Sequence, residues 1–423
     1  MKEKLAILGG PKTKKEPFPP HPIIGDEEKN AVMEVLNKGR LSTFIAAPGE
    51  NFLGGEKIKQ LERFFSEYHS TEYAVAFNSA TAALHAAVVA CGVQPGQEVI
   101  TTPYTFTSTA TCALMANAVP VFADIKPDTF NIDPEDIVKH ISPLTKAIIP
   151  VHLFGNPAEM GKILEIASEN DLKIIEDCAQ APAARYENNL VGTLGDCGIF
   201  SLTENKNITS GEGGMLITDD KNIAEIARLI RNHGEAVIAG QEKRTYSSTI
   251  LGWNYRMTEV DAAIGVEQFK KLDGFTAERN NLANYLTERL RNFEGLTPPK
   301  VREGDYHAYY VYAVLYDREK IGIDRSLFVR ALNEEGIPFG GGYIKPLYFS
   351  PIYHENRPFI YKYYEGNADY SPGTCPVAEY LHNDGLIMTL LTRPPATFKD
   401  MDCIIKAIEK IFDNIGLLRG MED

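Results

Sequence analysis

Two side chains of opposite charge stand where the ends of apolar segments could bring them together for chemistry. Asp177 closes the run KIIED, and Lys206 lies in the Gly-rich turn ENKNITSGEGG that follows the run GIFSLT. A carboxylate directly after a buried strand costs free energy unless a cation or a hydrogen-bond donor meets it. Taken singly, Asp177 could instead cap a helix, and Lys206 could be an ordinary solvated lysine.

The turn around Lys206 matches neither of two common phosphate-binding motifs. A P-loop needs Gly-Lys-Ser/Thr leading into a helix, and a dinucleotide fingerprint needs a further glycine where Leu216 stands. By itself, the turn therefore predicts no nucleotide site.

Two other apolar runs are followed by residues that could hold a flat, anionic ligand. After YAVAF the chain continues Asn78-Ser79-Ala80-Thr81 and opens an Ala-rich helix, whose N-terminus could bind an anion. After EVITT an aromatic residue, Phe106, stands at the strand end. When each feature is taken alone, a Ser/Thr helix cap and core packing of the ring are the better explanations.

Together, the four features match the needs of one cofactor, pyridoxal phosphate. Its phosphate needs an anion-binding cup, its ring a flat side chain, its pyridine nitrogen a carboxylate and its aldehyde a lysine. Ligands of parallel sheets bind beyond the carboxyl ends of the strands, so residues that follow successive strands can meet there. The sequence therefore predicts a pyridoxal-phosphate site centred on Lys206 and Asp177.

The segments that carry these residues predict an α/β fold with a mostly parallel sheet between helices. Short apolar runs alternate with amphipathic segments, which is typical of strands buried on both faces. We expect helices over residues 26–37, 57–68, 80–91, 107–115, 157–170, 221–232, 258–271, 276–293, 325–335 and 399–415.

The pattern also divides the chain into three parts. Residues 1–25 are rich in Lys and Pro and predict an extended N-terminal arm. Residues 26–270 contain the alternation of strands and helices and form the predicted large domain. Residues 271–423 mix strands such as HAYYVYAVLY with helices, which predicts a smaller α+β domain.

Charge and composition exclude several classes of function. A net charge of −14 without a basic block argues against nucleic acid and against anionic membrane surfaces as partners. No segment approaches the roughly 18 consecutive apolar residues of a membrane span, and the run Leu5–Leu8 is too short for a signal peptide. Six scattered cysteines without a CxxC pair favour free thiols and no metal site. We therefore expect a cytoplasmic protein.

Several segments closely resemble the DegT/DnrJ/EryC1/StrS family of sugar aminotransferases, which are fold-type I pyridoxal-phosphate enzymes. The segments are FNSATAALHAA, ITTPYTFTSTA, PVHLFGNPAEM, IIEDCAQA, FSLTENKNITSGEGGMLIT and GWNYRMTEVDAAIG. The resemblance covers residues 25–290 in order, and the later part more weakly. It implies transfer of an amino group from glutamate or glutamine to a keto-sugar (nucleotide-linked, phosphorylated or free) or a keto-cyclitol, in ping-pong through pyridoxamine phosphate.

The resemblance also implies a role for each matched position. Lys206 matches the Schiff-base lysine, and Asp177 matches the partner of the pyridine nitrogen. The other matched positions are the ring-hydroxyl ligand Gln180, the phosphate donors Ala80, Thr81 and Ser201, the stacked aromatic Phe106 and the neighbouring subunit's phosphate ligand Asn254. A site shared in this way implies at least a homodimer.

Some positions depart from the family pattern. Ala80 stands where glycine is frequent, and Leu202 and Thr203 stand where the family has an aromatic residue and often histidine. The loop LSTFIAAPGENFLGG is longer than expected, and we expect it to shape the substrate mouth.

The acceptor substrate is less well determined by the sequence. Tyr343, Lys345 and His382 are candidates for binding it, or else ordinary surface residues. The opening LAILGGPKT and the length resemble members that aminate cyclitols and keto-sugars without a nucleotide.

Two other functions stay open on the same fold. A pyridoxal-phosphate sugar dehydratase or other lyase is one, although such dehydratases lack the lysine that Lys206 matches. A non-catalytic regulatory protein is the other, although it would not need Lys206, Asp177 and Gln180 intact.

Overall fold

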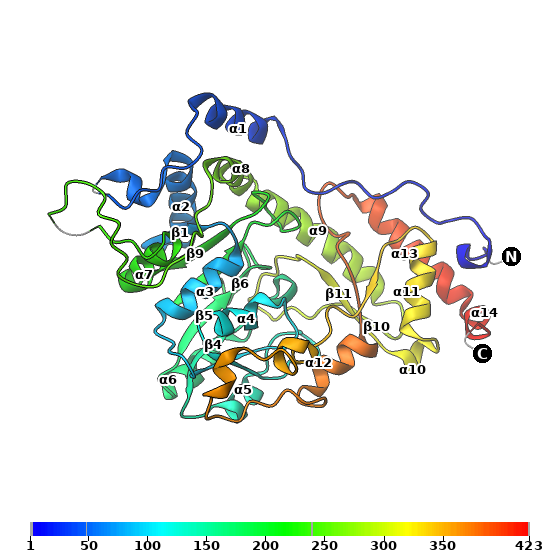
Figure 1. Ribbon diagram of the computed structural model, residues 1–423. Coiled ribbons are helices and arrows are strands. Elements are labelled where there is room, and N and C mark those ends of the chain that lie inside the picture. Colours follow the sequence, from blue (N-terminus) through cyan, green and yellow to red (C-terminus); the bar gives the residue numbers. More distant parts are fainter. Residues whose placement is uncertain (1–2, 48, 238–239, 422–423) are drawn as a thin grey trace.

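The computed structural model of the chain describes residues 3–47, 49–237 and 240–421 (Figure 1). A seven-stranded sheet has the order β1-β9-β8-β5-β4-β2-β3. Its strands are β1 (Tyr73–Phe77), β2 (Glu98–Thr101), β3 (Val119–Phe122), β4 (Thr145–Ile149), β5 (Lys173–Asp177), β8 (Cys197–Ser201) and β9 (Gly214–Thr218). Only β9 runs antiparallel to its neighbours in this sheet. The predicted mostly parallel sheet is confirmed.

Helices cover both faces of this sheet because successive strand residues point to opposite sides. Val75 and Phe77 of β1 pack with one set of helices, whereas Ala74 and Ala76 pack with the other. The first set is α3 (Ala80–Ala90), α4 (Ser108–Met115) and α7 (Lys221–Arg231). The second is α2 (Glu56–His69), α5 (Pro134–His140), α6 (Met160–Glu169) and α8 (Glu259–Phe269). Helix α1 (Asp26–Lys38) packs on α8 through Ala31 and Val35.

A second, antiparallel sheet has the order β10-β11-β13-β12. Its strands are β10 (Leu296–Thr297), β11 (Tyr312–Tyr316), β12 (Gly340–Gly341) and β13 (Leu386–Thr389). It shares a core with the long helices α9 (Leu272–Leu290), α11 (Arg325–Glu334) and α13 (Phe398–Asp413). In Figure 1, α9 runs from the large sheet to this second layer. The α+β character expected after residue 270 agrees with this layer, and the boundary itself stays a prediction.

Several short strands and α-helices lie between or after these elements. They are β6 (Arg185–Tyr186), β7 (Asn189–Leu190), α10 (Arg318–Ile321), α12 (Pro376–Tyr380) and α14 (Ile415–Arg419). Among the described residues, no helix combines the length and the apolar character needed to cross a membrane.

The N-terminal arm ties the second layer to the lysine loop. Leu5 lies in the core of the second layer, and Lys14 forms an ion pair with Asp400 at 2.8 Å. The arm then runs along the molecule to α1 (Figure 1), and His21 Nε2 donates a hydrogen bond to the carbonyl of Lys206 at 3.1 Å. Residues 1 and 2 of the expected arm, and Pro48 of the expected substrate loop, lie outside the described residues.

Candidate active site

The carboxyl edge of the large sheet brings the predicted lysine and carboxylate together. Asp177 is the last residue of β5, Ser201 is the last residue of the neighbouring strand β8, and Lys206 follows in the loop that leads to β9. Asp177 is 3% exposed and Lys206 is 9% exposed. The expectation that residues after successive strands meet at one edge is thus realised for these three.

The amine of Lys206 is buried against an aromatic ring. Its Nζ atom lies 4.4 Å from the ring centroid of Tyr310. Burial lowers the pKa of Lys206 to about 8, and the negative charge of Asp177 opposes this shift. A lysine with such a pKa has a substantial neutral fraction near neutral pH, and the neutral amine is the nucleophile.

Asp177 is held by both its side chain and its backbone. Thr109 Oγ1 donates a hydrogen bond to Oδ2 at 2.8 Å, and the N–H of Ala179 donates to Oδ1 at 3.1 Å. Its backbone N–H donates to the carbonyl of Pro150 at 2.9 Å. Burial raises the pKa of Asp177, while these two donors and the charge of Lys206 lower it. The two donors fix the orientation of the carboxyl group, and the effect of burial outweighs theirs, so the pKa of Asp177 is raised overall.

A buried pair beside Asp177 stabilises the end of β5. His152 Nδ1 accepts a hydrogen bond from the N–H of Ala158, so its Nε2 carries the proton and donates to Glu176 Oε2 at 3.0 Å. Backbone N–H groups of residues 192, 194 and 195 also donate to Glu176. With Cys178 these side chains form a cluster of metal-ligand types, but protein donors already use both oxygens of Glu176.

The side-chain amide of Gln180 forms one hydrogen bond through its oxygen and one through its nitrogen. Its Oε1 accepts from the N–H of Phe154 at 2.8 Å, and its Nε2 donates to the hydroxyl of Tyr343 at 3.1 Å. The N–H of Tyr343 in turn donates to the hydroxyl of Tyr104 at 2.9 Å. Tyr343, predicted as a substrate ligand, is thus joined to the predicted cofactor ligand Gln180.

The N-terminus of α3 lies where the sequence predicts an anion-binding cup. Ser79 caps the helix by accepting the N–H of Ala82 at 3.1 Å, and the N–H groups of Ala80 and Thr81 have no partner within the helix. Gly214 of β9 packs so closely that a Cβ atom there would lie 2.4 Å from the nitrogen of Ala80. The third predicted donor, Ser201, accepts the N–H of Thr203 at 3.4 Å.

Two predicted cofactor residues are exposed. Phe106, in the loop after β2, is 59% exposed and makes no ring contact among the described residues. Asn254 is exposed, and its Oδ1 accepts from Arg256 Nε at 2.9 Å. The neighbouring rings of Trp253 and Tyr255 pack against His85 of α3.

The structure does not connect Lys345 and His382 to the lysine site. Lys345 is exposed and its amine lies 4.7 Å from the ring of Phe349, while the carbonyl of His382 accepts from Arg325 at 2.8 Å. In the part of the chain that the structure describes, neither shares a hydrogen bond or an ion pair with Lys206, Asp177 or Gln180. Their substrate role stays a prediction.

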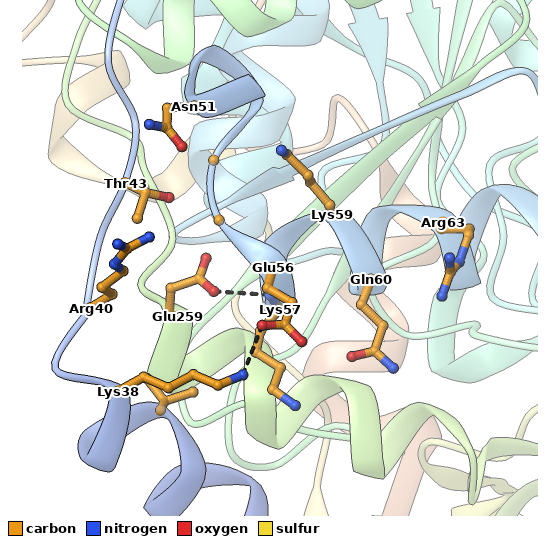
Figure 2. Close-up of a pocket in the computed structure, with 13 residues that line it drawn as sticks. Lys38, Arg40, Thr43, Asn51, Glu56, Lys57, Lys59, Gln60, Arg63 and Glu259 are labelled. Carbon is orange, nitrogen blue, oxygen red and sulfur yellow. Dashed lines mark hydrogen bonds and ion pairs between the residues drawn. The ribbon is translucent and has the colours of Figure 1, made fainter. Parts of the chain in front are cut away.

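A cavity of about 850 Å³ lies apart from these residues, between α1, α2 and the start of α8 (Figure 2). Basic side chains line it, but Lys38 pairs with Glu34 and Glu56, each at 2.8 Å. The N–H of Lys57 donates to Glu259 at 2.8 Å. Thr43, Asn51, Gly54 and Gly55 of the expected substrate loop line this cavity, whereas none of the predicted cofactor residues does, so its size does not identify it as the reaction site.

Sequence reasoning missed two direct neighbours of the central pair. Thr109 is the hydroxyl donor to Asp177, and Tyr310 forms the wall beside Lys206. Thr109 stands in the strand-end segment TFTSTA and could have been found there. Tyr310 comes from the distant segment HAYYVYAVLY, and only the tertiary structure brings it to the lysine.

The site fits pyridoxal phosphate by the chemistry of its donors. A buried amine with a lowered pKa, a fixed buried carboxylate and a helix N-terminus cradled by Gly214 match the aldehyde, the pyridine nitrogen and the phosphate. Fold and site together define a fold-type I α/β enzyme.

Comparison with known proteins identifies the family. The chain belongs to the DegT/DnrJ/EryC1/StrS aminotransferase family, whose model matches residues 22–409. It is 36% identical to the L-glutamine:2-deoxy-scyllo-inosose aminotransferase of Streptomyces kanamyceticus, over 83% of this chain and 82% of that protein. It is 33% identical to the GDP-perosamine synthase of Caulobacter vibrioides, over 92% of this chain and 96% of that protein.

A solved structure supports the same fold. The aminotransferase from Psychrobacter cryohalolentis superposes with a TM-score of 0.84 at 30% sequence identity, covering 95% of this chain and 100% of that chain. The predicted family, fold class and aminotransferase activity are confirmed.

Proposed function

We propose that the protein transfers an amino group from glutamate or glutamine to a keto-sugar or keto-cyclitol, with pyridoxal phosphate bound at Lys206. The observation that carries this proposal is the buried Lys206 beside the buried, doubly hydrogen-bonded Asp177. Relatives named for a cyclitol and for a nucleotide-linked sugar support this class of acceptor. The proposed acceptor is therefore a keto-cyclitol or a keto-sugar that is free, phosphorylated or nucleotide-linked.

Asp177 has the task of keeping a proton on the pyridine nitrogen. When bound, pyridoxal phosphate supplies an electron-accepting ring that stabilises negative charge at the α-carbon of the amino donor. With the cofactor bound, an ionised Asp177 would hold the pyridine nitrogen and favour its protonated form, because a negative charge stabilises a nearby positive one. Thr109 and Ala179 hold its oxygens in place, so the carboxylate needs no rearrangement.

Lys206 has the task of moving a proton at the reacting carbon. Its Nζ atom, with a pKa of about 8, is basic enough to take a proton from the donor's α-carbon and acidic enough to return it. Because the same lysine and carboxylate serve donor and acceptor, the two substrates react in turn. This predicts ping-pong kinetics.

We further propose a cytoplasmic homodimer whose active site includes Asn254 of the second copy. The side chain of Asn254 is exposed on its own subunit, and nearby Leu251 and Tyr246 are 82% and 74% exposed. Apolar exposure of this extent is typical of a surface covered by a partner. The free cysteines are mostly buried, which suits a reducing compartment.

The proposal is tested by purifying the holoenzyme and a Lys206→Ala variant. We expect the native protein to show visible absorbance that an amino donor removes and a keto compound restores, so a panel of acceptors identifies the substrate. Lys206→Ala should lose both the lysine-dependent absorbance and turnover. Transamination by Lys206→Ala would contradict the proposal. Loss of water from a sugar without amino transfer would show a lyase, and absence of cofactor absorbance would favour a regulatory protein.

A further inference from the structure

The side-chain amide of Gln180 has one orientation that satisfies its neighbours. Gln180 is 3% exposed and stands shortly after β5. The backbone N–H of Phe154 lies 2.8 Å from Oε1, and because this N–H is a donor it must face the amide oxygen. The amide nitrogen Nε2 therefore lies on the side of Tyr343, 3.1 Å from its hydroxyl. Gln180 donates this second hydrogen bond, and Tyr343 accepts it.

This orientation leaves one N–H group of the amide for a further partner. Nε2 carries two N–H groups, and the hydroxyl of Tyr343 is its one hydrogen-bond partner among the residues that the structure describes. Rotation of the amide by half a turn would bring Nε2 against the N–H of Phe154 and place two donors face to face. Gln180 thus offers a donor, and not an acceptor, to a group that binds beside it.

The place of the Tyr343 hydroxyl is fixed by the backbone and the ring of this residue. Its N–H donates to the hydroxyl of Tyr104 at 2.9 Å, and the N–H of the preceding Gly342 donates to the carbonyl of Leu386 at 2.7 Å. The ring of Tyr343 makes edge contacts with Tyr104 and Phe154, at centroid distances of 5.9 and 5.1 Å. The amide of Gln180 cannot turn without losing its bond to this fixed hydroxyl.

The Tyr343 hydroxyl also stays neutral over the pH range in which an enzyme works. Burial raises its pKa, and the nearby Tyr310 and Asp177 raise it further, whereas the hydrogen bond from Gln180 opposes these effects. A neutral hydroxyl accepts an N–H through its oxygen lone pairs. The bond that orients Gln180 is therefore not lost by titration of Tyr343.

We propose that Tyr343 is a positioning residue, which holds the amide of Gln180 so that its free N–H faces the ring oxygen of bound pyridoxal phosphate. The inference rests on the proposed function, in which Gln180 is the ligand of that oxygen. A donor at this position favours the negatively charged form of the oxygen and takes up part of its charge.

The position of the ring oxygen in the cofactor determines what this donor changes. The oxygen and the aldehyde stand on neighbouring ring carbons of pyridoxal phosphate, so the nitrogen that Lys206 contributes lies beside the oxygen. A negative charge nearby favours the protonated form of this nitrogen, and a donor that takes up part of the charge weakens the effect. Gln180, held by Tyr343, should therefore keep the pKa of the cofactor-bound nitrogen low.

The test is a pH titration of the visible absorbance of the cofactor-loaded protein, without any substrate. Tyr343→Phe removes the hydroxyl and keeps the ring, and it should raise the midpoint by about one pH unit, the effect of roughly one hydrogen bond. Tyr353→Phe is the matched control, because Tyr353 is buried in the same aromatic cluster and its hydroxyl has no hydrogen-bond partner. This control should keep the native midpoint.

A double substitution tests whether Tyr343 acts through Gln180. Gln180→Leu should raise the midpoint by itself, and the addition of Tyr343→Phe should raise it no further, because the amide that transmits the effect is already missing. Additive shifts in the double variant would overturn the inference, since Tyr343 would then act on the cofactor directly.

Two results with the single variants would also overturn the inference while leaving the proposed function intact. One is an equal shift in Tyr343→Phe and Tyr353→Phe, which would show an effect of repacking only. The other is an unchanged midpoint in Tyr343→Phe, and a raised KM for the keto acceptor would then assign Tyr343 to the substrate. Absence of lysine-bound cofactor in the native protein would instead contradict the proposed function.

Discussion

At the scale of single residues, the chemistry depends on how burial changes the acid–base properties of Lys206 and Asp177. Burial disfavours the charged form of each group, so it lowers the pKa of the amine and raises the pKa of the carboxyl. Their mutual attraction opposes both shifts. The result is an amine with a pKa of about 8 and a carboxyl group whose pKa stays raised although two hydrogen-bond donors oppose the effect of burial.

The lowered pKa of Lys206 predicts how pH controls cofactor attachment. Only the neutral amine reacts with an aldehyde, and its fraction grows as pH rises through the pKa of about 8. Addition of pyridoxal phosphate to the apoprotein should thus give visible absorbance at a rate that increases with pH, with a midpoint near 8. Asp177→Asn should move the midpoint lower, because the charge of Asp177 raises the pKa of Lys206. A midpoint near the ordinary lysine value of 10.5 would show that Lys206 is not buried as described.

The hydroxyl of Thr109 should contribute to stability and to catalysis, because without it the buried carboxyl group of Asp177 loses a hydrogen-bond donor. Thr109→Val keeps the shape of the side chain, and we expect it to cost about 1–3 kcal/mol of stability or of transition-state stabilisation. Its kcat should fall more than its KM changes. Thr111→Val is the control on the same helix, since its hydroxyl donates only to an exposed backbone carbonyl. Equal effects of the two substitutions would contradict the role of Thr109.

The central residues of the site could be predicted from the sequence, but the residues that support them could not. Lys206, Asp177 and the start of α3 follow strands, and strand ends converge by topology alone. Tyr310 reaches the lysine from a segment more than one element away in the chain. Its approach depends on how the second sheet packs, and no local pattern encodes that packing.

At the scale of elements, the position of α3 depends on its contact with β9. Gly214 lies against the first residues of α3, and a Cβ atom there would come within 2.4 Å of both Ser79 and the nitrogen of Ala80. The N-terminus of the helix therefore keeps its N–H groups at the carboxyl edge only while this position has no side chain.

Gly214→Ala should displace the anion-binding cup. Overpacking of this kind costs about 1–3 kcal/mol, and we expect a lower melting temperature and faster loss of pyridoxal phosphate during dialysis. Gly274→Ala is the matched control, because Gly274 lies in α9 with open space around its Cα atom. Alanine there should be neutral or stabilising by about 1 kcal/mol. Cofactor retention by Gly214→Ala equal to that of the control would contradict this account.

The long amphipathic helices and the buried strands could be predicted because their apolar periodicity is strong. Helix α5 was missed because its buried apolar residues are only Pro134 and Ile137. Strand β13 was not predicted because its run LIMT has only four residues, although the turn signal Asn383-Asp384-Gly385 precedes it. Residues 347–378 were expected in the small domain, yet Tyr348, Tyr353 and Tyr370 pack against Phe122 of the large sheet. Aromatic side chains pack equally well in the core of either sheet. The amino-acid composition of residues 347–378 therefore does not predict which sheet this segment packs against.

At the scale of the whole molecule, the N-terminal arm reaches the lysine loop, and the surface around Asn254 is exposed. His21 of the arm contacts the lysine loop directly. The loop that contains Asn254 carries the exposed apolar side chains of Leu251 and Tyr246. In the proposed homodimer, a second copy would cover this exposed surface.

A homodimer with shared sites predicts complementation between two defective variants. Asn254→Ala and Lys206→Ala should each lower activity, whereas subunits mixed from both should regain part of it, because one site of each mixed dimer has both residues intact. Light scattering should show a dimer for every protein. Failure to regain activity in verified mixed dimers would contradict a shared site and would place Asn254 within its own subunit's site.

The most direct test of the central claim is to trap the cofactor on the protein by borohydride reduction and map the labelled peptide by mass spectrometry. The account predicts a pyridoxyl group on the peptide that contains Lys206 and on no other lysine, with no label in Lys206→Ala. A label on another lysine, or an unlabelled Lys206 in a protein that still transfers amino groups, would contradict the assignment of Lys206 and Asp177 as the catalytic pair.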